Sequence, residues 1–164
     1  FLWQGPGVPL APIPTSAWKR FDHTIGSETC PGQPNSTGGA ATTTLEGISL
    51  VAANNLTLES EGLPPNSFGF YLTSLVPGFV AGPAGSAGDL CLGGSIGRYV
   101  AASEIRQATR AGTFSLVLDL GSVPTPNGFT SVQSGETRYF QAWYRDANPT
   151  PTSNFTSAAG ATFQ

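Results

Sequence analysis

The sequence predicts an all-β fold, an antiparallel β-sandwich of immunoglobulin-like or jelly-roll type with about eight or nine short strands. Glycine and proline supply 21 and 14 of the 164 residues, and turn signals recur at the spacing of short strands. Only 10% of the residues are charged, too few to cover the exposed faces of helices. Hydrophobic residues make up 39%, enough for one packed core. We expect one domain over residues 19–164, preceded by an arm over residues 1–18.

The first 18 residues are unlike a polar linker. Prolines at positions 6, 9, 12 and 14 exclude a helix or a central strand and favour an extended chain. The apolar side chains of this arm belong to Phe1, Leu2, Trp3, Val8, Leu10 and Ile13. An apolar extended terminus is expected to dock on protein, either on its own domain or on a neighbouring copy.

The first half of the domain begins with a polar connection over residues 19–41. Residues 42–52 are rich in β-branched and aliphatic side chains, which predicts a strand. Residues 55–61 and 67–75 alternate between apolar and polar positions, the pattern of strands with one buried face. Residues 77–88 are expected to form a long loop, because glycine and proline recur through them.

The second half has its clearest strand over residues 113–120. Phe114, Leu116 and Leu118 lie on one face of that strand. Residues 101–110 have some helical character, but Gly112 would end a helix there, so we expect a turn. Further short strands are expected over residues 89–92, 96–100, 129–132 and 136–146, with an edge strand over 160–164 after a turn-rich segment at 148–152.

Cys30 and Cys91 are the only cysteines, and each lies beside turn residues. They lack the C-x-x-C spacing and the basic neighbours of reactive thiols, so we expect a structural disulfide between them. Closing a loop of this length stabilises a fold by roughly 4 kcal/mol. A disulfide implies an oxidising, extracellular location. The sequence starts at Phe1 without a basic leader, so we expect a processed chain whose targeting segment has been removed.

Composition and charge argue against several classes of function. A net charge of −3 with seven scattered basic residues disfavours nucleic-acid binding. No apolar run approaches the roughly 18 residues of a membrane helix, so we expect no membrane span. A single histidine, His23, and two distant cysteines do not make a zinc site, and Asp89, Asp119 and Asp146 lack the spacing of a calcium loop. We therefore expect no metal, no cofactor and no catalytic activity.

The strongest candidate for a ligand surface is the segment 139–146. As a strand, it places one set of side chains on a single face: Tyr139, Gln141, Trp143 and Arg145. If this face is exposed, aromatic rings beside Gln and Arg can stack on sugars and hydrogen-bond to them. In the other interpretation both faces are buried at the centre of the sandwich, with the polar ends of Trp and Tyr bonded to backbone.

Several short motifs also occur together along the chain. They are residues 30–31, 34–38, 63–66, 69–72, 88–94, 96–99, 116–120, 135–137, 140–146 and 152–156. As a set they resemble an uncharacterised C-terminal module of large secreted or surface proteins of environmental bacteria, over residues 29–164. The resemblance implies an extracellular bacterial β-module with no catalytic residue, and argues against eukaryotic-type glycosylation of the sequons at Asn35, Asn55 and Asn154. Arg138 stands where that module has tryptophan.

Two functional hypotheses follow from these observations. The first is an extracellular structural protein that assembles with copies of itself into a filament or fibre, its arm filling pockets on the next subunit with Val8, Leu10 and Ile13. The alternative is a carbohydrate- or cell-surface-binding module that holds a polysaccharide on the strand containing Trp143.

Overall fold

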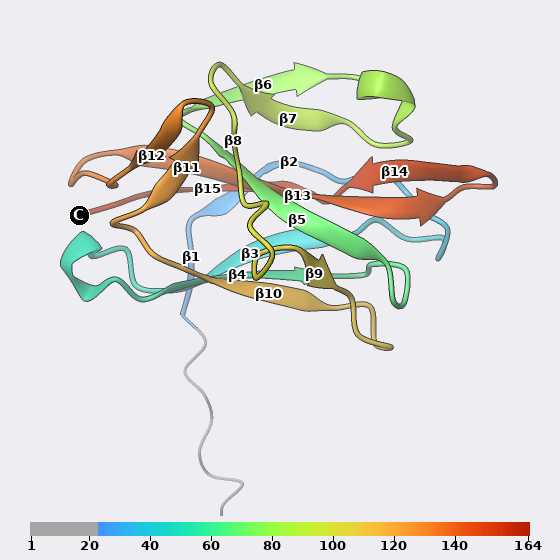
Figure 1. Ribbon diagram of the computed structural model, residues 1–164, viewed down its shortest axis with the longest axis horizontal. Coiled ribbons are helices and arrows are strands. Elements are labelled where there is room, and N and C mark those ends of the chain that lie inside the picture. The colour runs from blue at the N-terminus through green and yellow to red at the C-terminus, as the bar shows by residue number, and fades with distance from the viewer. Residues whose placement is uncertain (1–22) are drawn as a thin grey trace, which may run out of the picture.

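The computed structural model describes residues 23–164, so the arm expected over residues 1–18 lies outside the described residues. The described chain is all-β, with antiparallel sheets packed in a sandwich-like arrangement (Figure 1). Sheet A has the order β1 (Thr24–Ile25), β3 (Thr42–Gly47), β4 (Leu56–Glu61) and β10 (Phe114–Leu118). No helix among the described residues is long and apolar enough to cross a membrane.

Sheet B is the larger sheet. Its strands run in the order β2 (Ser27–Cys30), β15 (Ala158–Thr162), β13 (Thr137–Ala147), β5 (Phe68–Ser74) and β8 (Gly97–Arg98). Two further strands extend it, since β14 (Pro151–Phe155) pairs with β13 and β9 (Arg106–Gln107) pairs with β5. The long strand β13 is therefore the centre of the sheet, with neighbours on both sides.

Two small ribbons complete the described chain. β6 (Val76–Val80) pairs with β7 (Leu90–Gly93), and β11 (Val123–Thr125) pairs with β12 (Gly128–Thr130). Single 3₁₀ turns, η2 (Val51–Ala53) and η3 (Pro83–Gly85), lie in the connections. Figure 1 shows the β6–β7 ribbon as a third layer, on the side of sheet B that faces away from sheet A. This layer is the part of the fold that forms the candidate site.

The main core lies between sheets A and B and follows the period-two alternation of their strands. Sheet A contributes Leu45, Leu56, Leu58, Leu116 and Leu118, and sheet B contributes Tyr71, Phe140, Ala142 and Tyr144. The Tyr71 ring meets Phe114 edge-on at 5.3 Å between centroids, and its hydroxyl lies 3.2 Å from each of two sheet A carbonyls, those of Leu58 and Phe114. Burial raises the pKa of Tyr71 far above its ordinary value. This tyrosine therefore links the two sheets in its neutral form.

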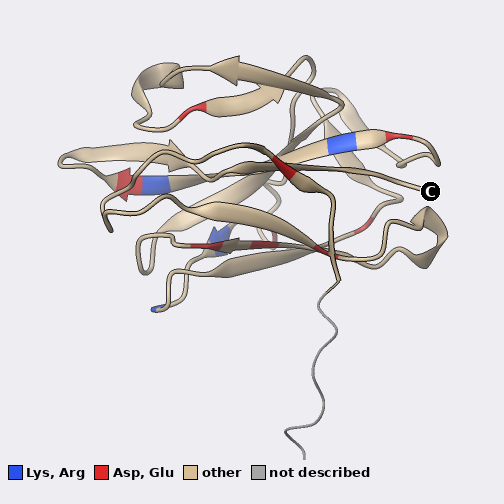
Figure 2. Cartoon of the chain, turned by 180° about the vertical axis from the view of Figure 1, so that it is seen from behind, with Lys and Arg blue, Asp and Glu red and all other residues tan. Residues whose placement is uncertain are grey.

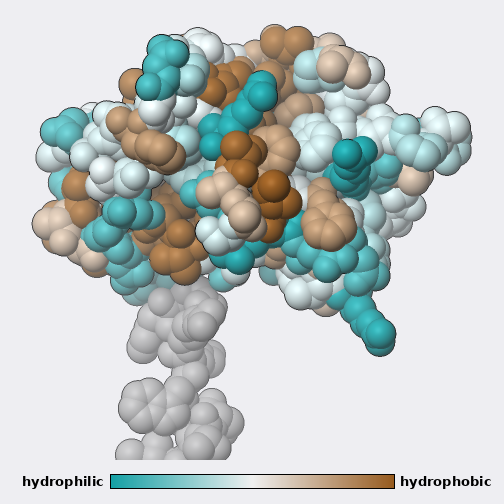
Figure 3. All heavy atoms as spheres, viewed as in Figure 1, coloured by the Kyte–Doolittle hydropathy of each residue, from teal (hydrophilic) through white to brown (hydrophobic). Residues whose placement is uncertain are grey.

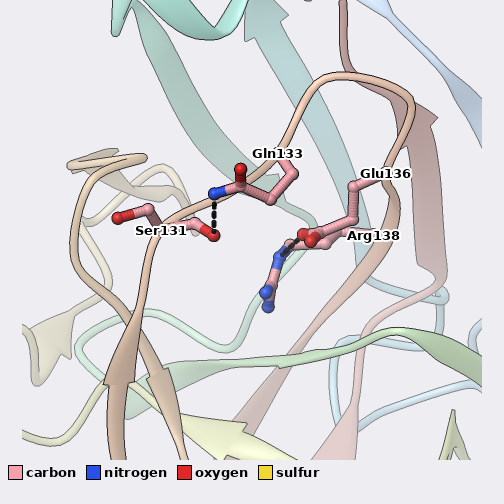
Figure 4. A network of polar contacts seen from close by, with 4 residues as sticks. All are labelled: Ser131, Gln133, Glu136 and Arg138. Atoms are coloured by element: carbon pink, nitrogen blue, oxygen red, sulfur yellow. Dashed lines mark hydrogen bonds and ion pairs between the residues drawn. The ribbon is translucent and has the colours of Figure 1, made fainter.

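Arg138 lies at one end of the buried face of β13. Its side chain is 3% exposed and forms an ion pair with Glu136 (Figure 4). Gln133, in the preceding turn, donates a hydrogen bond to the backbone oxygen of Ser131. Since a buried guanidinium without a carboxylate is costly, Glu136 is what makes an arginine tolerable at this position.

The predicted strands over 55–61, 67–75 and 113–120 correspond to β4, β5 and β10. The described residues contain more strands than expected. Several of these strands have only two or three residues, too few to show a pattern in the sequence. β1 and β2 lie in the supposed connection, β6 overlaps the supposed loop over 77–88, and β14 begins inside the supposed turn at 148–152 and continues beyond it. The segment 160–164 was expected at an edge, but β15 lies inside sheet B between β2 and β13. Its small residues fit there, since a Cβ on Gly160 would lie 2.7 Å from the Tyr139 ring.

Candidate ligand groove on the outer face of sheet B

The side chains of β13 alternate between the two faces of sheet B, as the sequence predicts. Phe140, Ala142 and Tyr144 are completely buried in the main core. Gln141, Trp143 and Arg145 lie on the opposite face, which we call the outer face of sheet B, with Tyr139. The outer face has its own smaller apolar cluster, formed by Leu72, Leu92, Phe155, Phe70, Leu90, Ile96, Tyr139 and Trp143. The β6–β7 ribbon covers part of this cluster and leaves the rest open.

The ribbon is held to sheet B by the predicted disulfide, which the structure confirms. Cys30 at the end of β2 is bonded to Cys91 on β7. The side chain of Gln141 makes the second attachment. Its Oε1 accepts a hydrogen bond from the Cys91 N–H at 2.9 Å, and its Nε2 donates to the backbone oxygens of Asp89 at 3.0 Å and Thr156 at 2.8 Å.

Gln141 is consequently not part of a ligand surface, contrary to the first of the two interpretations of segment 139–146. Its side chain is completely buried, and both ends of its amide are engaged by backbone. Tyr139 is half-buried and packs against Gly160, away from the open part of the face. The burial expected in the second interpretation is thus correct for Gln141, whereas Trp143 is only half-buried and Arg145 is exposed.

The loop that joins β6 to β7 is fixed to β14. The backbone oxygen of Ser153 accepts from the Ala87 N–H at 2.8 Å and from the Ser86 hydroxyl at 2.9 Å. Gly88 sits so close to β14 that a Cβ there would lie 1.9 Å from the side-chain oxygen of Asn154. At the tip, Ala84 has a left-handed backbone with φ 53°, a conformation that costs an L-residue energy.

Between this loop and sheet B lies a groove of about 450 Å³. Its apolar lining comes from Phe70, Leu72, Leu90, Ile96, Trp143 and Phe155. Arg98 and Ser153 supply polar groups. A smaller hollow of about 290 Å³, lined by Arg145 and Thr152, continues from it and shares Ala84, Trp143 and Ser153. We call the two together the Trp143 groove.

An aromatic pair forms part of the lining of the groove. The rings of Phe70 and Trp143 come from paired positions on β5 and β13, with centroids 5.1 Å apart and planes inclined by 31°. The guanidinium of Arg145 lies 5.8 Å from the centroid of the Trp143 ring, within cation–π distance. The groove therefore offers a ring surface for an apolar ligand face, with guanidinium and hydroxyl donors beside it.

A second hollow, of about 390 Å³, lies at the edge of sheet A beside Glu59, Glu61 and Arg106. Phe114 is the one aromatic residue in its lining, and that ring packs against Tyr71. The two carboxylates alternate along β4 with the buried Ser60. Because this hollow lacks an aromatic pair and a covering loop, the Trp143 groove is the better candidate site.

Phe70, Arg98 and Ser153 are the groove residues that the sequence did not identify. They face the groove because of strand pairing: Phe70 and Phe155 pair with Trp143, and Ser153 pairs with Arg145. The alternation over 67–75 already placed Phe70 and Leu72 on one face. Nothing in the spacing indicated which strand lies beside β13, and β14 was not expected at all.

The structure gives the burial of the three sequons and the hydrogen bonds of Asp89 and Asp119. Asn35 and Asn154 are buried, so the folded chain cannot carry a glycan on either, whereas Asn55 is exposed. Asp89 accepts hydrogen bonds from Gln33 and Gly82, and Asp119 accepts from Asn54 and Gly121. Within residues 23–164 no group of three or more His, Cys, Asp or Glu residues is placed to hold a metal ion.

Comparison with protein-family models, with curated proteins and with solved structures found no match for this chain.

Proposed function

We propose that this chain is an extracellular module that binds carbohydrate in the Trp143 groove, on a sandwich of immunoglobulin-like or jelly-roll type. The observation that carries the proposal is the Phe70–Trp143 pair in the lining of an open groove, with Arg145 against the indole. A sugar ring has an apolar C–H face and a rim of hydroxyls. An aromatic ring beside guanidinium and hydroxyl groups is complementary to both.

The rigidity of the groove also supports this proposal. One wall is tied to β14 through the backbone oxygen of Ser153 and to the sheet through Gln141 and the disulfide. A preformed site loses little conformational entropy when a ligand binds, which matters for the weak individual contacts that sugars make. Binding alone is proposed, with no catalytic step.

The first test replaces the indole. Trp143→Ala is expected to reduce binding to insoluble polysaccharides and to glycan arrays by at least about tenfold, because large aromatic side chains dominate such sites. Phe129→Ala is the matched control, since Phe129 is an aromatic residue that is 71% exposed on β12 and lies outside the groove. Far-UV circular dichroism and thermal unfolding of both variants establish that they are folded. Absence of binding to any polysaccharide, or equal binding by Trp143→Ala and wild type, would contradict the proposal.

Self-assembly through the arm is the second proposal. It is favoured by the apolar lining of the same groove, which suits the side chains of Val8, Leu10 and Ile13 as well as a sugar face. Deleting residues 1–14 is expected to convert large particles into smaller species, measured by light scattering and electron microscopy. Particles of unchanged size after the deletion would exclude this mode of assembly.

A further inference from the structure

We infer that the groove selects acidic polysaccharides, whose carboxylate or sulfate groups meet Arg98 and Arg145 at opposite ends of the aromatic pair. This inference rests on the proposed function and adds the class of ligand. It begins with the two guanidinium groups. Arg98 lies in the larger hollow and Arg145 in the smaller one, and both side chains are exposed.

Among residues 23–164, neither arginine forms an ion pair. The ion pair that the described residues form joins Arg138 to Glu136, at a different place on β13. Over residues 23–164, the lining of the two hollows contains no Asp or Glu. Arg98 and Arg145 therefore present uncompensated positive charge to whatever enters the groove, and an anion is the ligand group that compensates it.

The spacing of the two arginines fits a polymer better than a small ion. Arg98 pairs with Leu72, which in turn pairs with Gln141, four residues before Arg145 on β13. The strand rise and the spacing between strands put the Cα atoms of Arg98 and Arg145 about 17 Å apart. The Phe70–Trp143 pair lies between them. A chain of several sugar rings can stack on the aromatic pair while acidic groups on different rings reach the two arginines.

The negative charge of the whole protein does not oppose this binding strongly. Glu46, Glu59 and Glu61 lie on sheet A, whose outward surface is on the opposite side of the sandwich. Figure 2 shows red segments along those strands. At physiological salt, charges further away than about 8 Å are largely screened, so these sheet A carboxylates add little to the field at the two groove arginines.

An apolar surface beside the groove is the main competing explanation. Phe79 and Val80 on β6 are exposed, and Figure 3 shows brown side chains along the upper edge of the molecule, where β6 lies. These side chains are absent from the lining of both hollows. A partner that docks on them would not depend on Arg98 or Arg145, so the same experiment separates the two explanations.

The test compares polygalacturonate with its fully methyl-esterified form, which has the same backbone without free carboxylates. By affinity electrophoresis or calorimetry, wild type is expected to bind polygalacturonate at least about tenfold more tightly than the ester. Arg98→Gln and Arg145→Gln are each expected to weaken binding to polygalacturonate by about tenfold, because each removes a charge-assisted hydrogen bond. Arg110→Gln is the matched control, since Arg110 is exposed but lines neither hollow. Polyglutamate serves as a polypeptide anion.

Each outcome has a distinct meaning. Equal affinity for the acid and the ester, with no effect of the arginine variants, would overturn the acidic preference and leave carbohydrate binding intact. A loss with Arg110→Gln equal to the loss with Arg98→Gln would show a general charge effect and would also overturn it. Tighter binding to polyglutamate than to polygalacturonate would assign the groove to an acidic polypeptide. Absence of binding to both polysaccharides and to the neutral glycans of the array would contradict the proposed function itself.

Discussion

On β13, Phe140, Ala142 and Tyr144 point into the core between the two sheets, whereas Gln141, Trp143 and Arg145 point to the outer face. The inner residues are completely buried. Along the outer face, exposure rises from none at Gln141, through half-burial at Trp143, to exposure at Arg145. The strand is the same and the alternation is the same, so the difference comes from what covers each face.

Sheet A packs over Phe140, Ala142 and Tyr144 on the inner face, whereas the β6–β7 ribbon covers only part of the outer face. Where the ribbon lies over β13, a polar side chain is buried and used as an anchor, namely Gln141. Where the ribbon ends, an indole and a guanidinium are left beside a groove. A partial third layer thus creates a binding site on a sheet whose other face is ordinary core.

Removing the disulfide is expected to have the largest effect on stability and on the covering of the outer face. The Cys30→Ser/Cys91→Ser variant should lose about 4 kcal/mol of unfolding free energy, because the bond closes a loop with a sequence separation of 61. Urea denaturation measures the loss. Hydrogen exchange should show faster exchange in β6 and β7 than in β4 and β10, since the ribbon is then held only by Gln141 and by the hydrogen bonds from its loop to β14. Equal acceleration in all four strands would show that the ribbon is not an independent layer.

Replacing the anchor tests the covered part of the outer face. Gln141→Leu keeps the volume but leaves the Cys91 N–H and two carbonyls without their partner. Since a buried unpaired polar group costs about 1–3 kcal/mol, we expect a total loss of about 3 kcal/mol and weaker binding of ligand as the wall loosens. Gln133→Leu, at an exposed glutamine in a turn, should change stability by less than about 0.5 kcal/mol. Similar stabilities for the two variants would contradict the anchoring role of Gln141.

The sequence was sufficient for the parts of this fold that depend on local pattern. Turn signals, low charge and alternation predicted the all-β class, and alternation predicted the strand over 136–146 and the side chains that share one face of its segment 139–146. Two isolated cysteines beside turns predicted the disulfide. The strand predictions need only the pattern of one short segment. The disulfide prediction follows because each cysteine has no other cysteine to pair with.

The sequence was insufficient where long-range pairing decides the structure. β14 was missed because Pro151 and its turn-rich surroundings disfavour a strand, yet pairing with β13 supplies its hydrogen bonds. Gln141 was included among the candidate ligand residues because it lies on the same face of the strand as Trp143, two positions later. What separates them is the ribbon, whose position over sheet B depends on a disulfide and on contacts with β14. The groove residue Arg98 was missed because the sequence does not show that β8 pairs with β5.

Asp146, the next inward-facing residue after Tyr144, provides the smallest predicted effect. Burial raises the pKa of this carboxyl group, but hydrogen bonds from Ser36, Ala147 and Asn154 outweigh burial, so the pKa lies below its ordinary value of 3.8. A carboxyl group with a lowered folded-state pKa stabilises the fold at pH values above the unfolded-state pKa. That contribution is lost as the pH falls through the folded-state pKa. Stability should therefore decline below about pH 4.

Asp146→Asn isolates this contribution from those of the other acidic residues. The amide preserves the shape of the side chain but does not titrate, so the variant should be less stable than wild type at neutral pH by about 1 kcal/mol, and the difference should shrink on acidification. Urea unfolding at a series of pH values gives both quantities. Asn35 and Asn154 close this end of the inner face around Tyr144, and they have no charge to lose. If the difference in unfolding free energy between wild type and Asp146→Asn is constant with pH, the charge of the Asp146 carboxylate does not stabilise the fold, and only the shape of the side chain matters at this end of the inner face.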